Sequence, residues 1–190
     1  MKEYYKSDAR YLKLPIELPY LDMLAEARNL LDKFTPHRDD DYAHSGWASL
    51  TIHGLGWDKH ESYKTYGYAK GKDASADMKW TEIADQCPVT TQWLKEQFPC
   101  NRYGRVRFML LKAGGHIALH NDSSIPLLEN INIALNNPQG CVWRWGDGEE
   151  FVMEQGGVYA MNIHYPHELV NASDEDRVHL IIARHDATSE

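Results

Sequence analysis

Residues of the kinds that bind transition metals are concentrated in the second half of this 190-residue chain. His120 and Asp122 lie two residues apart, His167 lies on a distant segment, and Arg177 follows it. Two histidines and one carboxylate on one side of a metal ion leave the opposite positions open, as non-haem Fe(II) centres do to bind O₂ and a co-substrate. We therefore predict a metal site formed by His120, Asp122 and His167.

The segment from His116 to Asp122 reads as a β-strand, whose side chains alternate between two faces. Alternation places on one face His116, Ala118, His120 and Asp122, and on the other Ile117, Leu119 and Asn121. Because Ala118 is small, we expect His120 and Asp122 to project together into an enclosed space. An HxD motif alone is a weak signal, since any surface strand can carry one by chance.

The third ligand has to come from a distant segment. The candidate histidines are His164, His167, His179 and His185. We favour His167, because it follows a predicted strand and Pro166. The chain can return at this point to the cavity entrance where His120 and Asp122 are expected. His164 is more typical of a histidine in a loop.

Arg177 stands at the start of the most apolar predicted strand. A guanidinium that enters a protein core is costly unless it meets an anion, and its planar fork suits a carboxylate of a dicarboxylate co-substrate. The alternative is an internal salt bridge to Asp174 or Asp176. His179, on the same face as Arg177, is either a neighbour that supports the site or a packed core histidine.

The N-terminal half contains the elements that we expect to support this site. Apolar residues at helical spacing predict a helix over Leu21–Phe34, and alternation predicts a strand over Trp47–His53. Residues 56–79 form a long loop, which we interpret as a lid. Trp80–Phe98 is helical in part, with Thr90 or Thr91 as the cap and Trp93, Leu94 and Phe98 on the buried face.

After Cys100 the pattern changes to short strands separated by Gly, Asn, Asp or Pro turns. The predicted strands are Arg105–Lys112, His116–His120, Asn130–Asn136, Cys141–Trp145, Phe151–Met153, Val158–Ile163, His167–Val170 and Val178–Arg184. Short strands at this spacing suggest a jelly roll or barrel. We expect one domain over 1–190, with helical and loop support plus a first strand in 1–100 and a jelly-roll core with the metal site in 101–185.

Composition narrows the classes of function. The net charge of -8 argues against nucleic-acid or anionic-membrane partners, which demand clustered Lys and Arg. Three cysteines without a CxxC motif argue for a reducing compartment. The polar N-terminus lacks the apolar core of a signal peptide, and no apolar run could span a bilayer. We expect a cytoplasmic protein of unknown oligomeric state.

Three stretches together resemble the aspartyl/asparaginyl β-hydroxylase family of Fe(II)/2-oxoglutarate-dependent oxygenases, closest to its small, proline-hydroxylase-like branch. They read RVRFMLLKAGGHIALHND, NINIALNNPQGCVWRW and GGVYAMNIHYPHELVNASDEDRVHLI. The resemblance implies a double-stranded β-helix (cupin-like jelly roll) buttressed by N-terminal helices, with Fe(II) held by His120, Asp122 and His167. It also implies that Arg177 binds the distal carboxylate of 2-oxoglutarate. We keep His179, on the same face as Arg177, as a further candidate co-substrate ligand.

The chain departs from that family at two points. Asn130 and Asn132 stand where many relatives carry an Arg and a His that face the active site, and Met109 stands where some carry a serine that helps to hold 2-oxoglutarate. Neutral amides still hydrogen-bond a carboxylate, so we keep Asn130 and Asn132 as candidate co-substrate ligands.

The resemblance implies an enzyme that uses Fe(II), 2-oxoglutarate and O₂ to hydroxylate a C–H bond of an amino acid, free or within a peptide or protein. Two alternatives stay open. One is a cupin-type metal-dependent dioxygenase without an oxoacid co-substrate, and the other is a non-catalytic jelly-roll binding protein. Arg177 separates the first alternative from the main interpretation, because a carboxylate anchor has no purpose without an oxoacid.

Overall fold

The 18-residue strand β5 joins the two halves of the fold. In the computed structural model, which describes residues 8–37, 43–58, 78–97 and 103–184, its first half pairs antiparallel with β11 and its second half with β10. The elements are, in chain order, β1 Tyr11–Leu14, α1 Tyr20–Arg28, the 3-10 turn η2 Leu31–Lys33, β2 Thr35–Pro36, β3 His44–Gly54, β4 Lys79–Trp80, α2 Glu82–Gln86, α3 Pro88–Glu96, β5 Tyr103–His120, β6 Leu128–Ala134, β7 Cys141–Trp145, β8 Glu150–Phe151, β9 Val158–Asn162, β10 His167–Asn171 and β11 Arg177–Arg184.

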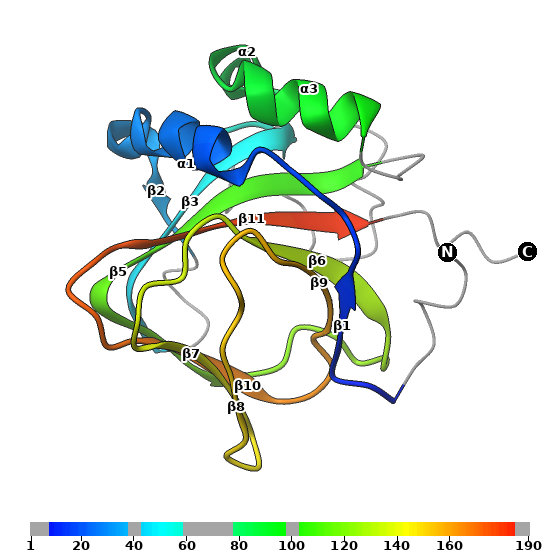
Figure 1. Ribbon diagram of the computed structural model, residues 1–190, viewed down its shortest axis with the longest axis vertical. Helices are drawn as coiled ribbons and strands as arrows, with labels where there is room; N and C mark the ends of the chain where they lie inside the picture. Colours follow the sequence, from blue (N-terminus) through cyan, green and yellow to red (C-terminus); the bar gives the residue numbers. More distant parts are fainter. Residues whose placement is uncertain (1–7, 38–42, 59–77, 98–102, 185–190) are drawn as a thin grey trace, which may run out of the picture.

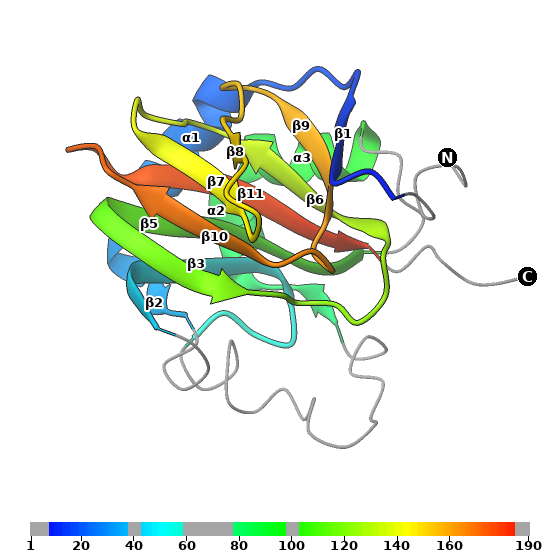
Figure 2. The same ribbon diagram turned by 90° about the horizontal axis from the view of Figure 1, so that it is seen from below.

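The strands form one antiparallel sheet that curls back on itself (Figure 1; Figure 2). One half has the strand order β1-β9-β6-β11-β5 and continues from β5 through β3 to β2 and β4. The other half has the order β5-β10-β7-β8. Because β5 belongs to both halves, the sheet closes into a double-stranded β-helix. The prediction of a mainly β jelly roll is confirmed.

The predicted turn between the strands Arg105–Lys112 and His116–His120 is wrong, because β5 runs through residues 113–115 without interruption. In the pairing with β3, Leu111 lies opposite Trp47 and His116 lies opposite Ser45. Residues 112–115 of β5 therefore form a bulge opposite the single residue Gly46 of β3. A Cβ on Gly115 would lie 2.7 Å from the carbonyl oxygen of Lys112. Glycine is therefore required for close backbone approach where β5 bends from one half of the sheet to the other.

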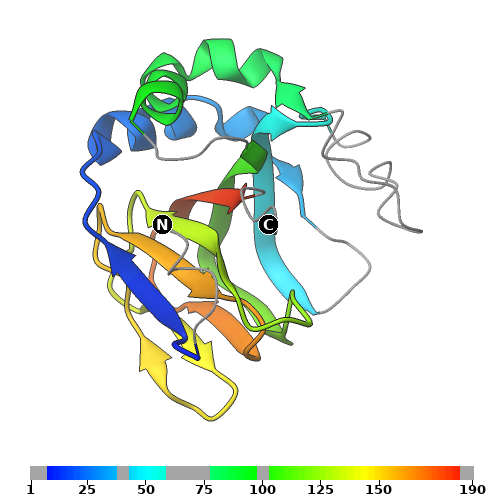
Figure 3. The ribbon, with the colours of Figure 1, turned by 90° about the vertical axis from the view of Figure 1, so that its right-hand side faces the viewer.

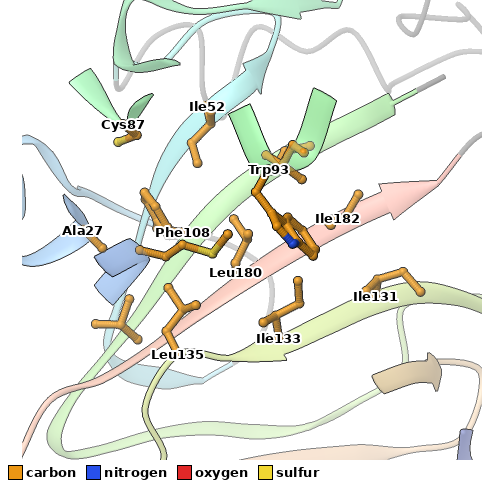
Figure 4. Packing of buried hydrophobic residues seen from close by; sticks show 14 of the residues in the cluster. Ala27, Ile52, Cys87, Trp93, Phe108, Ile131, Ile133, Leu135, Leu180 and Ile182 are labelled. Carbon is orange, nitrogen blue, oxygen red and sulfur yellow. The ribbon is translucent and has the colours of Figure 1, made fainter. Parts of the chain in front are cut away.

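Helices α1, α2 and α3 cover the outer face of the larger half of the sheet, and β7 and β8 lie at the far side (Figure 3). Apolar side chains from the helices and from six strands form the main core under them (Figure 4). Ala27 of α1 and Leu94 of α3 are fully buried there, as are Phe108 and Leu180 of the central strands. Each large side chain removed from water in this way contributes about 1.5–3 kcal/mol.

Period-two alternation divides the central strands between this core and a cavity. On β5, Phe108 faces the helices, whereas Arg107 and Met109 line the cavity on the other face of the sheet. On β11, Leu180 faces the core, whereas Ile181 lines the cavity. The same short sequence therefore positions functional side chains and packs the core.

The N-terminal predictions hold in part. Helix α1 begins at Tyr20 but ends at Arg28, and only a 3-10 turn continues the predicted Leu21–Phe34 helix. The predicted strand over Trp47–His53 lies within β3. The predicted helical caps are wrong: Thr90 and Thr91 lie inside α3, which starts at Pro88.

Thr81 is the capping residue instead, and its hydroxyl oxygen accepts a hydrogen bond from the Ile83 amide at the start of α2. Trp93 and Leu94 are buried as predicted. Most of the 56–79 loop, with its interpretation as a lid, lies outside the described residues, as does Phe98. None of the described helices is long and apolar enough to cross a membrane.

Phe108→Ala tests whether the helix-facing core stabilises the sheet that carries the cavity. Phe108 is fully buried, so truncation should lower the free energy of unfolding by about 3–5 kcal/mol. The measurement is chemical denaturation followed by circular dichroism. Val152→Ala, at a side chain that is 60% exposed, is the control and should change the same free energy by less than about 0.5 kcal/mol. Equal effects of the two variants would contradict the assignment of the core.

Candidate metal centre and its cavity

The structure brings His120, Asp122 and His167 together at one end of the cavity. His120 ends β5 and lies directly opposite His167, the first residue of β10. One ligand atom from each of the three residues lies within 4.8 Å of the others. Ligands about 2.1 Å from a shared ion lie about 3 Å apart when their bonds are perpendicular. The donor set therefore fits one transition-metal ion after a small inward movement of the side chains.

A β-bulge turns His120 into the cavity. In the pairing of β5 with β10, Leu169 lies opposite Ile117 and His167 opposite His120, so one residue of β10 faces two of β5. The extra residue changes the phase of the alternation, and both Ile117 and His120 line the cavity.

The predicted faces of this segment are accordingly wrong for His116 and Ile117. His116 is exposed, and its Nδ1 lies 3.0 Å from the Ser45 hydroxyl rather than in the cavity. The expectation that His120 and Asp122 project together agrees with the structure, where Nε2 of His120 and a carboxylate oxygen of Asp122 are 3.5 Å apart.

Backbone carbonyls set the tautomers of both clustered histidines. Nδ1 of His120 lies 2.7 Å from the carbonyl oxygen of Ala118, and Nδ1 of His167 lies 2.9 Å from that of Tyr165. Each Nδ1–H donates to its carbonyl, which leaves the Nε2 lone pair for a metal. Burial lowers the pKa of His167 to about 4, and the proximity of His120 adds to the effect. The imidazole of His167 is therefore neutral at pH 7, the form that binds metals.

Arg177 lines the same cavity with its side chain almost fully buried. Within the described residues, no carboxylate forms an ion pair with it. The proposed alternative partner Asp176 instead accepts from Lys112 Nζ at 2.9 Å and from the amide of Ala113 at 3.0 Å. Burial lowers the pKa of Arg177 to about 10, so the group stays charged at pH 7. A buried positive charge without a counter-ion favours binding of an anion.

His179 lies behind Arg177 and is completely buried. Its Nδ1 accepts a hydrogen bond of 2.7 Å from Nη2 of Arg177, which makes the Nε2–H form the neutral tautomer. Burial and the adjacent guanidinium keep the pKa of His179 well below its usual value. His179 does not reach the cavity wall, so its contact with a ligand runs through Arg177.

Asn130 and Asn132 line the cavity from β6. Nδ2 of Asn132 donates a 3.4 Å hydrogen bond to Oδ1 of Asn130, and Oδ1 of Asn132 is buried without a partner in the described part of the chain. The thioether of Met109 lies on the same wall. The hollow is partly open to solvent and is lined by both polar and apolar side chains, as small-molecule sites are.

Sequence reasoning missed Arg107, His37, Trp47 and Trp143, which also line the cavity. Alternation from Met109 would have placed Arg107 on the same face. No local signal marks His37, because the β2–β3 pairing brings it there. Its Nδ1 lies 3.0 Å from the Ser49 hydroxyl and its Nε2 lies 3.4 Å from Nη1 of Arg107.

Solved structures with this fold include several oxygenases. An oxidoreductase of the 2OG-Fe(II) oxygenase family from Burkholderia pseudomallei has 13% identity, with 94% of this chain and 86% of that chain covered and a TM-score of 0.54. AviO1 from Streptomyces viridochromogenes Tue57 has 16% identity, with 95% and 91% covered and a TM-score of 0.53. A Trichoplax adhaerens prolyl hydroxylase in complex with a peptide fragment of the hypoxia inducible factor oxygen degradation domain has 12% identity, with 96% and 89% covered and a TM-score of 0.51. At such identities the likeness concerns the fold.

No curated protein matches the chain in sequence. The family model for aspartyl/asparaginyl β-hydroxylase, however, matches residues 18–185, which include every strand from β2 to β11 and all three helices. The resemblance noted in three stretches thus extends over almost the whole chain. This protein belongs to the aspartyl/asparaginyl β-hydroxylase family of Fe(II)/2-oxoglutarate-dependent oxygenases.

Proposed function

We propose that this protein hydroxylates a C–H bond of a carboxylate-bearing amino acid, free or within a peptide, with Fe(II), 2-oxoglutarate and O₂. The observation that carries the proposal is the placement of a metal-binding cluster and a buried, uncompensated guanidinium in one cavity. A metal-binding cluster by itself would equally suit a structural metal ion, and a buried guanidinium by itself would suit any small anion. Together they offer separate positions for the metal and for the far end of a dicarboxylate co-substrate.

His120, Asp122 and His167 would hold the iron. When bound, Fe(II) supplies the activation of O₂, coupled to decarboxylation of 2-oxoglutarate to succinate and CO₂, that converts a substrate C–H group into an alcohol. The protein contributes geometry to this chemistry. The carbonyls of Ala118 and Tyr165 orient the two imidazoles, and the ring of Trp143 stacks on His167 at 4.4 Å.

Arg177 would bind the distal carboxylate of 2-oxoglutarate. Guanidinium groups bind carboxylates through two parallel hydrogen bonds, and such charge-assisted bonds are strong in a dry site. Because His179 accepts from Nη2, the guanidinium plane is fixed before the ligand arrives. An oxoacid-independent dioxygenase would leave this buried charge without a counter-ion, so the observation favours the oxoacid.

The position of Arg107 in the cavity supports the proposal that the substrate carries a carboxylate of its own. Arg107 stands opposite Ile181 on β11, whereas Leu111 stands opposite Arg177, so the two arginines are attached about 13 Å apart along the sheet. Because the two side chains start from points this far apart, we infer that they bind different ligands. His37 and Trp47, which contact each other in an edge-on arrangement at 4.3 Å, would form the neighbouring wall of the substrate pocket.

The metal assignment is tested by anaerobic titration of Fe(II) and 2-oxoglutarate, read by the weak visible charge-transfer band of the chelate. The unmodified protein should give the band, and His167→Ala should abolish it because one of three protein ligands is lost. His164→Ala is the matched control: His164 lies three residues away and contacts the Ser123 carbonyl, so the band should persist. Loss of the band in both variants, or in neither, would contradict the ligand set.

The two arginines are predicted to act on different ligands. Arg177→Gln should raise the Kd for 2-oxoglutarate about 30-fold or more, since loss of one partner of a buried charge pair costs about 2 kcal/mol or more. Arg107→Gln should leave that Kd nearly unchanged and raise the KM of a carboxylate-bearing substrate about tenfold.

The assay for this pair is anaerobic titration for 2-oxoglutarate and steady-state kinetics for the substrate found by screening amino acids and short acidic peptides. If both variants weakened the binding of 2-oxoglutarate equally, the division of the cavity between co-substrate and substrate would be wrong.

A further inference from the structure

Two buried tryptophans of β7 have indole N–H groups without a hydrogen-bond partner in the described part of the chain. They are Trp143, 5% exposed, and Trp145, 2% exposed. An indole nitrogen is a donor only, and a buried donor left unpaired costs about 1–3 kcal/mol. Trp143 lines the metal-site cavity, whereas Trp145 lines a separate hollow beside Arg10.

Trp143 lies between the two ends of that cavity. Its ring stacks on His167, with an interplanar angle of 16°. On the same face of β7, two residues earlier, lies Cys141; burial raises the pKa of its thiol, and the nearby guanidinium of Arg177 opposes this rise. Trp143 therefore stands on the wall between the metal cluster and Arg177.

Within the described residues, no acceptor lies within hydrogen-bond distance of the Trp143 N–H. Leu169, its partner on β10, is apolar, and so are Ile117 and Ile163. A ligand that binds between the metal and the guanidinium would supply an acceptor. In the proposed function that ligand is an oxoacid, whose carboxylate oxygens accept hydrogen bonds and have no donors of their own at pH 7.

We propose that Trp143 is an oxoacid-binding residue, whose indole N–H donates a hydrogen bond to a carboxylate oxygen of 2-oxoglutarate. This inference rests on the proposed function and adds a donor to the charge supplied by Arg177. The ring has a second role: by stacking on His167 it holds the imidazole plane of a metal ligand. One side chain thus contacts both the co-substrate and a ligand of the metal.

Trp143→Phe separates the two roles, because phenylalanine keeps a ring that can stack and removes the N–H. Trp145→Phe makes the same chemical change at an unpaired indole outside the cavity and is the matched control. In an anaerobic titration of 2-oxoglutarate into the Fe(II)-loaded proteins, Trp143→Phe should raise the Kd about tenfold or more, as expected for a hydrogen bond to a charged group. Trp145→Phe should change it less than twofold, and the Fe(II) affinity of both variants should match that of the parent.

A measurement on the unsubstituted protein covers the case in which Trp143→Phe does not fold. With Zn(II) in place of iron and ¹⁵N-labelled indoles, addition of 2-oxoglutarate should shift one indole N–H resonance downfield, and this resonance should persist in Trp145→Phe. If the parent protein bound no 2-oxoglutarate, the proposed function would fail. If the parent bound it but Trp143→Phe bound as tightly as Trp145→Phe, or no indole resonance shifted, only the role of Trp143 would be overturned.

Discussion

The buried positive charge of Arg177 is the constraint on which the function of this cavity depends. Its guanidinium is removed from water, contacts neutral His179, and has no carboxylate partner in the described ranges. Such a charge is tolerated only if other interactions offset its desolvation, and here the main core of the sheet supplies that stability. In the proposed function, the fold therefore maintains a binding position for an anion, and the cluster of His120, Asp122 and His167 in the same cavity determines which anions also reach a metal.

Two bends of β5 place Arg177 and the cluster of His120, Asp122 and His167 in the same cavity. The glycine bulge at residues 112–115 carries the strand from the half-sheet that holds Arg177 to the half-sheet that holds His167. The second bulge, opposite β10, then rotates His120 inward. Without the first, the metal ligands and the guanidinium would not share a cavity; without the second, His120 would point away from His167. Two local irregularities thus define the site.

The sequence was sufficient to predict the fold class, most strands, and the three residues that the structure gathers in one cluster, because these depend on local alternation and on short motifs. It was insufficient for features that depend on pairing between distant segments. The bulge that reverses the faces of His116 and Ile117 is a property of the β5–β10 register. His37 reaches the cavity through β2–β3 pairing, and the exposed or buried state of an indole such as Trp143 depends on which strand lies beside it.

The division of β5 and β11 between two faces also bears on how such an enzyme changes during evolution. Phe108 and Leu180 pack in the core under the helices, whereas their sequence neighbours Arg107, Met109 and Ile181 line the cavity. Substitutions at the second set leave the packing of the first intact. Substrate preference can therefore diverge between related chains by single steps at every other residue, while thermal stability is inherited almost unchanged.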